Sequence, residues 1–262
     1  MVESTERFAE LVARPEAEIP LDEVAFLIAA HGRLDLDVDA ELARLDALAA
    51  GGHGATLDAL VAYLFGELGF VGDRQHYYDP RNSYLDEVLT RRRGIPITLS
   101  VLAVTVGRRM GVPLVGVGMP GHFLVRDEVD PATFVDPYHG GALLDRDGCA
   151  ALFHRAHGDS VPFEDHFLAP VGTLDVAGRM LNNLRNVFVS RGDRQSLTWV
   201  LRLRTMLPGS PAEDQVDLGA ALASVGRYVD AAFEYEGAAQ RLGGTLGQEY
   251  GRNASRLRAR LN

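Results

Sequence analysis

Hydrophobic residues recur at helical spacing through the first 70 residues. In the segment TLDALVAYLFGELGF (56–70) the apolar side chains fall on one face of a helix. Thr56 is suited to cap the start of this helix, and Gly69 is suited to end it. The preceding segment DAELARLDALAA (39–50) has leucines at intervals of three residues and is followed by two glycines. The pattern therefore predicts helices that pack together.

The pattern changes in the middle of the chain, from helical spacing to alternation. The segment ITLSVLAVTVGRRM (97–110) is apolar nearly all round, which predicts a buried helix, and Pro96 is suited to its first turn. Ser83, with Asp86 three residues later, predicts the start of a short helix before it. Beyond Gly111, three segments alternate like strands: LVGVGM, HFLVRD and ATFVDP, within residues 114–137. A buried helix followed by antiparallel strands predicts an α+β fold.

The C-terminal part is helical again and contains a repeat. Residues 182–197 align with residues 216–231 at a period of 34, with glycine at matching turn positions. This period is typical of the paired helices of tetratricopeptide repeats. We therefore predict three regions: a helical N-terminal region (1–72), an α+β core (73–167) and a helical tail of tetratricopeptide-like repeats (168–262).

Composition and charge exclude several classes of function. The 262 residues carry a formal charge of −10, which argues against a nucleic-acid partner because such binding needs a basic face. All 26 basic residues are arginine, so no mechanism that depends on lysine is available. The chain has no run of about 18 apolar residues, and its start does not resemble a signal peptide. We expect a cytoplasmic protein without a membrane partner.

The pair His122 and Asp136 is the main candidate for chemistry. Each lies in a predicted strand, and a turn between the strands would bring the two side chains together. A carboxylate beside an imidazole fixes its tautomer and stabilises its cation, as a general base requires. The alternative is a buried pair with a purely structural role. A nucleophile that completes the site is expected at the start of the buried helix, where the helix dipole lowers the pKa of a thiol.

Cofactor sites are not predicted. GVGMPG (116–121) matches a dinucleotide-binding pattern, but a strand-like segment follows it instead of the helix that phosphate binding needs. His139, together with His122 and Asp136, would supply two imidazoles and a carboxylate to a metal ion. The spacing permits this convergence without requiring it, so the sequence predicts neither a bound metal nor another cofactor.

A long segment of the chain resembles a known family. The run YYDPRNSYLDEVLTRRRGIPITLSVLAVTVGRRMGVPLVGVGMPGHFLVR, followed by FVDPYHGGALL, resembles the SirB family of transglutaminase-like proteins with C-terminal tetratricopeptide repeats. The resemblance implies a papain-like α+β core in which active members use a Cys–His–Asp triad. It assigns the histidine position to His122 and the aspartate position to Asp136.

The chain departs from that family pattern at the nucleophile. The resemblance places the catalytic cysteine at the start of the buried helix, and this position is at or near Pro96. Cys149, the only cysteine, lies after both His122 and Asp136, and we expect it to be a buried structural thiol. Thr98 and Ser100 are weaker nucleophile candidates, because a hydroxyl depends heavily on its base and on an oxyanion hole.

A polar turn before the buried helix is a candidate binding element. Its residues Tyr78, Arg81, Asn82 and Ser83 offer an aromatic ring, a cation and polar caps, and with His139 they are positioned to border the same cleft as His122. The alternative is that they serve only the turn.

Two functions follow from these observations. The first is a non-catalytic regulatory or protein-binding module, with a protein or peptide partner, since helical repeats present concave surfaces to partners. The second is a hydrolase or acyl-transferase in which His122 and Asp136 act with a hydroxyl or a metal-bound water. The sequence gives no oligomeric state, and a cysteine-dependent transglutaminase or protease is not expected.

Overall fold

The computed structural model describes residues 2–260, and the chain folds into two compact units. The first unit holds residues 15–180, and the second joins residues 2–14 with the chain from residue 181 on. Each unit has its own buried core. That of the first unit includes Leu152 and Phe153, and that of the second includes Leu218 and Leu222.

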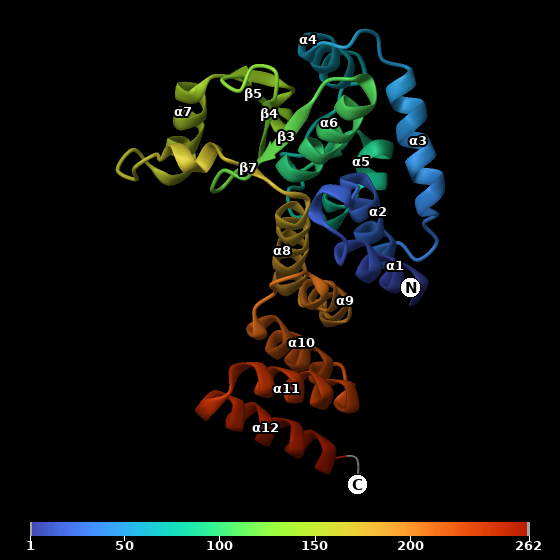
Figure 1. The fold of residues 1–262 in the computed structure, drawn as a ribbon, viewed down its shortest axis with the longest axis vertical. Coiled ribbons are helices and arrows are strands. Elements are labelled where there is room, and N and C mark those ends of the chain that lie inside the picture. Colours follow the sequence, from blue (N-terminus) through green and yellow to red (C-terminus); the bar gives the residue numbers. More distant parts are fainter. Residues whose placement is uncertain (1, 261–262) are drawn as a thin grey trace. The chain divides into compact units, whose positions relative to one another are not determined.

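Helices form the N-terminal part of the first unit (Figure 1). They are η1 (Glu16–Glu18), α2 (Leu21–Gly32), α3 (Val38–Ala50), α4 (Leu57–Val61), the π-helical turn η2 (Ala62–Glu67), η3 (Pro80–Ser83), α5 (Leu85–Arg91) and α6 (Pro96–Met110). The side chain of Thr56 accepts a hydrogen bond from Ala59 N, as its position before the apolar pattern predicted. The helix continues through η2, and Gly69 follows with a φ of +72°.

Helix α6 is the central helix of this unit, and the prediction that it is buried is confirmed. It contacts α2, α3 and α5 as well as the sheet, and Leu99, Leu102 and Val106 along it are fully buried. Pro96 occupies the first turn, where the missing N–H costs no helical hydrogen bond. Gly111 ends the helix in a left-handed conformation, with a φ of +78°.

The short helix before α6 does not begin where the sequence predicted. Helix α5 starts at Leu85, and Ser83 ends the preceding turn η3 instead of capping α5. The reason lies at Asp79, whose carboxylate accepts a hydrogen bond from Arg81 N and so starts the helical turn earlier. The N-cap of α5 is Tyr84, so the start predicted at Ser83 was wrong by one residue.

A five-stranded sheet follows α6 in the order β6-β5-β4-β3-β7, and all neighbouring strands are antiparallel. The strands are β3 (Leu114–Val117), β4 (Leu124–Asp127), β5 (Phe134–Asp136), β6 (Ala142–Leu144) and β7 (Pro170–Val171). His122 precedes β4 by two residues, which corrects the expectation that it lies within the strand. A separate parallel pair joins β1 (Val71–Gly72) to β2 (Arg93–Gly94).

The sheet lies between α6 and helix α7 (Arg146–His157) within the first unit (Figure 1). On the α7 side, Leu124 and Phe134 pack with Cys149 and Phe153. The turn η4 (Pro137–His139) follows β5 and contacts α6 and β1, and η5 (Asp165–Leu168) leads into β7. This arrangement holds the ends of β4 and β5 against the central helix.

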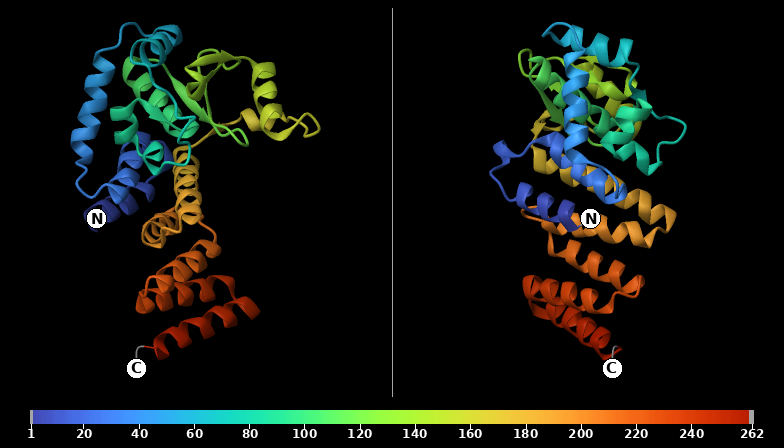
Figure 2. Two further views of the ribbon diagram at one scale, coloured as in Figure 1. Left: turned by 180° about the vertical axis from the view of Figure 1, so that it is seen from behind. Right: turned by 90° about the vertical axis from the view of Figure 1, so that its right-hand side faces the viewer.

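The described residues of the second unit form helices joined by short turns. It contains α1 (Val2–Val12), the part of α8 (Thr173–Arg191) beyond Met180, α9 (Arg194–Met206), α10 (Ala212–Ser224), α11 (Tyr228–Leu242) and α12 (Gly244–Ala259). Helices α9 to α12 lie one beside the next, each in contact with its neighbour (Figure 2).

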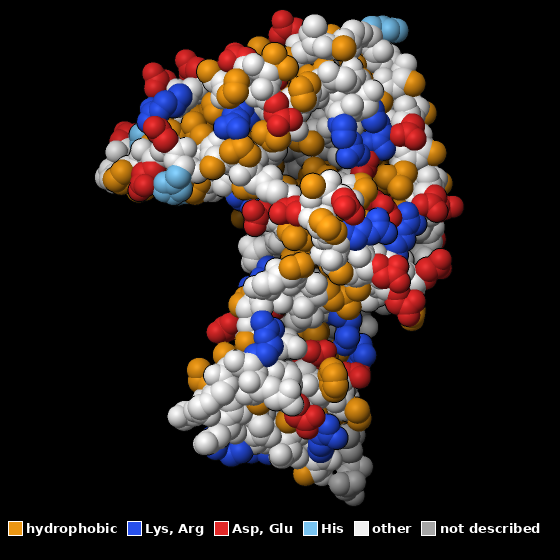
Figure 3. Space-filling view, in the orientation of Figure 1, with side chains coloured by type: hydrophobic (Ala, Val, Ile, Leu, Met, Phe, Trp, Pro, Cys, Tyr) orange, Lys and Arg blue, Asp and Glu red, His pale blue; other side chains and the backbone are white. Residues whose placement is uncertain are grey.

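Charges of both signs are interspersed on the face of the first unit seen in Figure 3, and neither sign covers it. No helix between residues 2 and 260 has the length and apolar character needed to cross a bilayer.

Candidate functional site

Strands β4 and β5 bring His122 and Asp136 together. The register pairs Val125 with Val135, so the start of β4 lies beside the end of β5. His122 Nε2 is 3.0 Å from Asp136 Oδ1. A carboxylate oxygen can only accept, so Nε2 carries the proton and Nδ1 is the nitrogen that remains for a third partner.

Asp136 is the centre of a buried hydrogen-bond network. Its Oδ1 also accepts bonds from the backbone N–H groups of Tyr138 (3.1 Å) and His139 (3.3 Å), which caps the turn η4. Its Oδ2 is 2.6 Å from His139 Nδ1. Burial raises the pKa of Asp136, but the hydrogen bonds and charges of His122 and His139 outweigh this effect and hold the pKa below its ordinary value. The carboxylate therefore stays ionised between two imidazoles.

Arg179 of α8 fixes the turn that carries His122. Its guanidinium donates to the carbonyl oxygens of Gly118, Met119 (3.1 Å) and His122 (3.2 Å). The same group lies over the Phe123 ring, 5.2 Å from its centroid. Burial lowers the pKa of Arg179. This residue was not predicted from the sequence, because a single arginine in a helix gives no sign of partners 57 residues away.

The start of α6 carries no nucleophile for His122. Pro96 is the first residue of the helix. Thr98 and Ser100 are fully buried, and both hydroxyls donate to carbonyl oxygens. Thr98 Oγ1 is 2.6 Å from Asn82 O, and Ser100 Oγ is 3.4 Å from Phe123 O. Neither hydroxyl is a hydrogen-bond partner of His122 among the described residues.

Cys149 lies in helix α7, within the core between that helix and the sheet. It is fully buried, and burial, together with the charges of Asp145 and Asp136, raises the pKa of its thiol to about 12. A thiol in these surroundings is not ionised at neutral pH, so it is no substitute nucleophile.

The candidate binding residues of the polar turn fall into two groups. Asn82 and Ser83 are buried, and Asn82 Nδ2 donates to His76 O at 2.7 Å. Tyr78 and Arg81 lie at the surface, and Arg81 is paired with Asp79 at 2.6 Å.

A chain of aromatic rings connects the surface to the imidazoles. Tyr78 contacts Tyr77 edge-on (5.2 Å between centroids), and Tyr77 contacts Tyr138 (6.1 Å). Tyr138 in turn contacts His122 (6.0 Å) and His139 (5.3 Å). Tyr78 and His139 are among the residues predicted from the sequence, but Tyr138 is not, although it directly follows the Asp136-Pro137 pair. We call these five rings the aromatic cluster.

The described residues contain one group of three or more potential metal ligands. His122, Asp136 and His139 each offer one ligand atom, and these atoms lie within 4.8 Å of one another. Two imidazoles and a carboxylate form a ligand set that binds divalent transition metals. The convergence that the spacing permitted is therefore present.

Comparison with known proteins gives one family for this chain. Residues 21–182 match the sequence model of the Transglutaminase-like superfamily. A UPF0162 protein of Xylella fastidiosa is 37% identical over 209 residues, which cover 74% of each chain. A UPF0162 protein of Vibrio cholerae is 30% identical over 165 residues, covering 61% of this chain and 60% of that protein.

A shorter match extends to a eukaryotic protein. F-box only protein 21 of Mus musculus is 51% identical over 70 residues, which are 27% of this chain and 11% of that protein. No solved structure matches the chain.

Proposed function

The chain belongs to the transglutaminase-like superfamily, and we propose that it is a SirB-type member without a catalytic cysteine that works as a protein-binding module. One observation carries this proposal: Pro96, which has no nucleophilic atom, occupies the first turn of the central helix. The hydroxyls that follow it are buried on carbonyl oxygens, and the single thiol lies in the core.

The aromatic cluster supports binding as the role that the site retains. Tyr78 is 68% exposed and Tyr77 is 38% exposed, while Asp136, which caps the turn of Tyr138, is buried and bonded on both oxygens. Exposed tyrosines on a rigid base are typical of protein and peptide recognition, because the ring contributes contact area with little loss of conformational entropy. On this proposal Asp136, which caps η4, holds Tyr138 in position, and His122 activates no nucleophile.

The helices of the second unit support a repeat tail as a further part of the module. Gly192 and Gly226, 34 residues apart, both adopt left-handed conformations, with φ of +66° and +81°. Each ends a helix and is followed within two residues by the next one. This regularity agrees with tetratricopeptide-like helical pairs, which present surfaces to partner peptides.

The absence of catalysis is tested with acyl substrates. We expect the wild-type chain to hydrolyse p-nitrophenyl acetate no faster than the His122→Ala variant does, and neither to join hydroxylamine to a glutamine peptide. Circular dichroism and thermal unfolding would confirm that the variant is folded. Turnover by the wild type that His122→Ala abolishes, in a folded protein, would overturn the proposal.

The binding role is tested by comparing variants of the full chain as bait in extract from the source organism. We expect His122→Ala to retain the partner that the wild type captures, and the double variant Tyr77→Ala, Tyr78→Ala to lose at least about 90% of it. Purified partner should then show at least about tenfold weaker affinity for the double variant, which is the effect of a hot-spot residue. Equal capture by all three baits contradicts a role for the aromatic cluster.

The cluster of His122, Asp136 and His139 favours a second candidate function, a metal-dependent hydrolase. A divalent metal held by these residues would lower the pKa of a bound water and supply hydroxide at neutral pH. Calorimetric titration with Zn²⁺ or Mn²⁺ tests this. Binding should weaken at least about tenfold in His139→Ala and stay unchanged in His154→Ala, whose imidazole lies outside the cluster. Hydrolysis that depends on the metal and on His139 would replace the first proposal with this one.

A further inference from the structure

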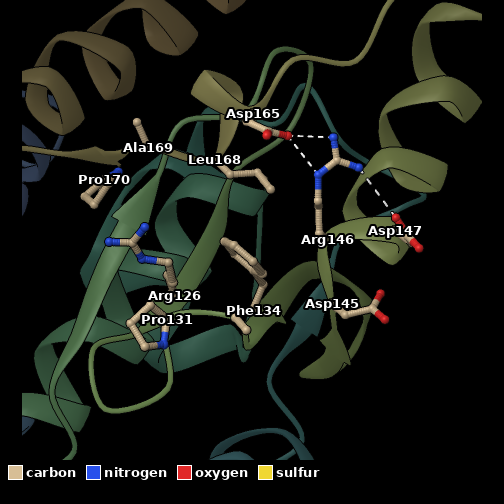
Figure 4. Close-up of a pocket in the computed structure, with 11 residues that line it drawn as sticks. Arg126, Pro131, Phe134, Asp145, Arg146, Asp147, Asp165, Leu168, Ala169 and Pro170 are labelled. Atoms are coloured by element: carbon tan, nitrogen blue, oxygen red, sulfur yellow. Dashed lines mark hydrogen bonds and ion pairs between the residues drawn. The ribbon is translucent and has the colours of Figure 1, made fainter.

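A cavity of the first unit lies away from the aromatic cluster, beside the β4–β5 turn. It has a volume of about 670 Å³ and opens between that turn, the start of α7 and the segment from η5 to β7 (Figure 4). This volume is in the range of small-molecule sites. None of the residues that line it belongs to the His122–Asp136–His139 cluster.

The surface of the cavity is mainly apolar. Phe134, Leu168 and Pro170 line it, and Pro131 closes it from the β4–β5 turn. Phe134 faces the cavity on the same side of the sheet as Arg126, its neighbour across the β4–β5 ladder. A ligand with an apolar body can therefore bury that body against Phe134 and Leu168.

The two arginines of the cavity differ in their partners. The guanidinium of Arg146 is paired with Asp165 (2.6 Å) and Asp147 (3.5 Å). No described residue accepts a hydrogen bond from the Arg126 guanidinium or forms an ion pair with it, and its Nε is enclosed without an acceptor. Figure 4 shows this guanidinium between Pro131 and Pro170, on the side away from the Arg146 ion pairs.

The Arg126 guanidinium lies beside an apolar surface and has no anionic partner among the described residues. Its planar N–H groups match the two oxygens of a carboxylate, and such pairs are stronger than neutral hydrogen bonds. Asp145, which caps α7 through a bond to Gly148 N, lines the cavity on the other side. Its charge disfavours a second negative charge on the ligand.

From these observations we propose that this cavity binds a small carboxylic acid with an apolar body, its carboxylate on Arg126 and its body against Phe134 and Leu168. The ligand is a monoanion, because the carboxylate of Asp145 repels a second charge at the other end. This binding is independent of the proposed protein-binding role and of any chemistry at His122.

The test uses the full chain with three acids: benzoate, 3-phenylpropionate and hexanoate. Titrations followed by protein-observed NMR give dissociation constants, with 3-phenylpropionamide as the neutral analogue and 2-phenylethylamine as the cationic one. We expect saturable binding of at least one acid, with perturbed signals at Phe134 and Leu168. The amide should bind at least about tenfold more weakly, as loss of a charge-assisted hydrogen bond predicts.

Two substitutions distinguish the contributions of Arg126 and Arg146 to acid binding. Arg126→Gln should weaken acid binding at least about tenfold, while Arg146→Gln, which removes a cation that already has partners, should change it less than about threefold. Thermal unfolding checks that both variants are folded. The proposal is overturned if none of the acids binds, if the amide or the amine binds as tightly as the acid, or if Arg126→Gln binds as the wild type does.

Discussion

Asp136 determines the candidate site because it bonds to both imidazoles and caps the turn that carries one of them. Its Oδ1 accepts hydrogen bonds from His122 Nε2 and from two backbone N–H groups, and its Oδ2 accepts one from His139 Nδ1. A carboxylate with so many donors keeps its charge and orients His122 with Nδ1 away from it. His122 Nδ1 is thus the nitrogen that faces a third partner, and Pro96 at the start of α6 has no group that it could activate.

A cysteine at that position would test whether the orientation of His122 is still that of a triad. In Pro96→Cys we expect a thiol pKa at least about one unit below the ordinary 8.5, because the N-terminus of α6 and the imidazole both favour the thiolate. The pH dependence of alkylation by iodoacetamide gives this pKa. Cys149, whose thiol has a pKa raised to about 12 in the core, should stay unlabelled in the folded protein.

Two controls accompany this measurement. Adding His122→Ala to Pro96→Cys should return the pKa to about 8 or above, close to the value of an exposed thiol, and Ala47→Cys on the exposed face of α3 supplies that exposed reference. A Pro96→Cys thiol with an ordinary pKa would mean that the imidazole and the start of α6 are not aligned.

His31 gives the protein a stability that depends on pH near neutrality. It is buried in α2, and its Nδ1 lies 2.7 Å from Leu27 O. Burial lowers the pKa of His31 in the folded state, despite the opposing effect of that carbonyl. As the pH falls, the unfolded chain therefore takes up this proton at a higher pH than the folded protein does. The contribution of His31 to stability is complete above about pH 6.5 and is lost as the pH falls below it.

The expected loss of unfolding free energy with falling pH has an upper limit, and a second histidine supplies the control. One proton accounts for at most about 1.4 kcal/mol per pH unit below about pH 6.5. Urea unfolding at about pH 7.5 and about pH 5.5 should show a smaller difference in His31→Gln than in the wild type, while His53→Gln, at a position outside the core, should keep the wild-type difference. Equal differences in the wild type and His31→Gln would contradict the assignment.

At the scale of elements, close packing of α6 against the chain that follows it holds the site together. A Cβ at Gly107 would lie 2.9 Å from Val112 O and 3.1 Å from side-chain atoms of Leu114 and Leu60. The helix can approach the start of β3 this closely only because residue 107 has no side chain. Displacement of α6 would also move its bond from Ser100 to Phe123 O, next to His122.

Gly107→Ala should therefore destabilise the protein by about 1–3 kcal/mol, since the cost of overpacking exceeds the gain of about 1 kcal/mol in helix propensity. The matched substitution is Gly66→Ala in η2, where a Cβ meets nothing within 4 Å. That variant should be neutral or stabilised by up to about 1 kcal/mol. Chemical denaturation measures both, and stabilisation by Gly107→Ala would show that the neighbouring backbone yields more readily than its geometry indicates.

Across the whole molecule, local signals predicted elements well and long-range contacts poorly. The cap at Thr56, the start of α6 at Pro96 and the alternation in β3 to β5 each act within a few residues, and each can be read from the sequence. Strands of two residues, such as β1 and β7, have no periodicity to detect.

The candidate site likewise contains one pair that the sequence predicted and long-range contacts that it did not. The pairing of His122 with Asp136 follows from two alternating strands and a turn. The contacts of Arg179 with Gly118 and of Tyr138 with Asp73 O join residues more than 60 positions apart. Such contacts depend on how the helices and the sheet pack, which no local pattern specifies.

The distribution of these contacts predicts which part of the chain is sufficient for the site. All of them fall within residues 73–179, inside the first unit and inside the matched range 21–182. A fragment of residues 15–182 should therefore unfold cooperatively and give His122 and His139 ring signals in NMR spectra like those of the full chain. A fragment of residues 15–167 lacks Arg179 and β7, so its His122 signals should shift or its fold should be lost. Unchanged His122 signals in the shorter fragment would show that Arg179 is not needed to position His122. An unfolded longer fragment would mean that the first unit does not fold on its own.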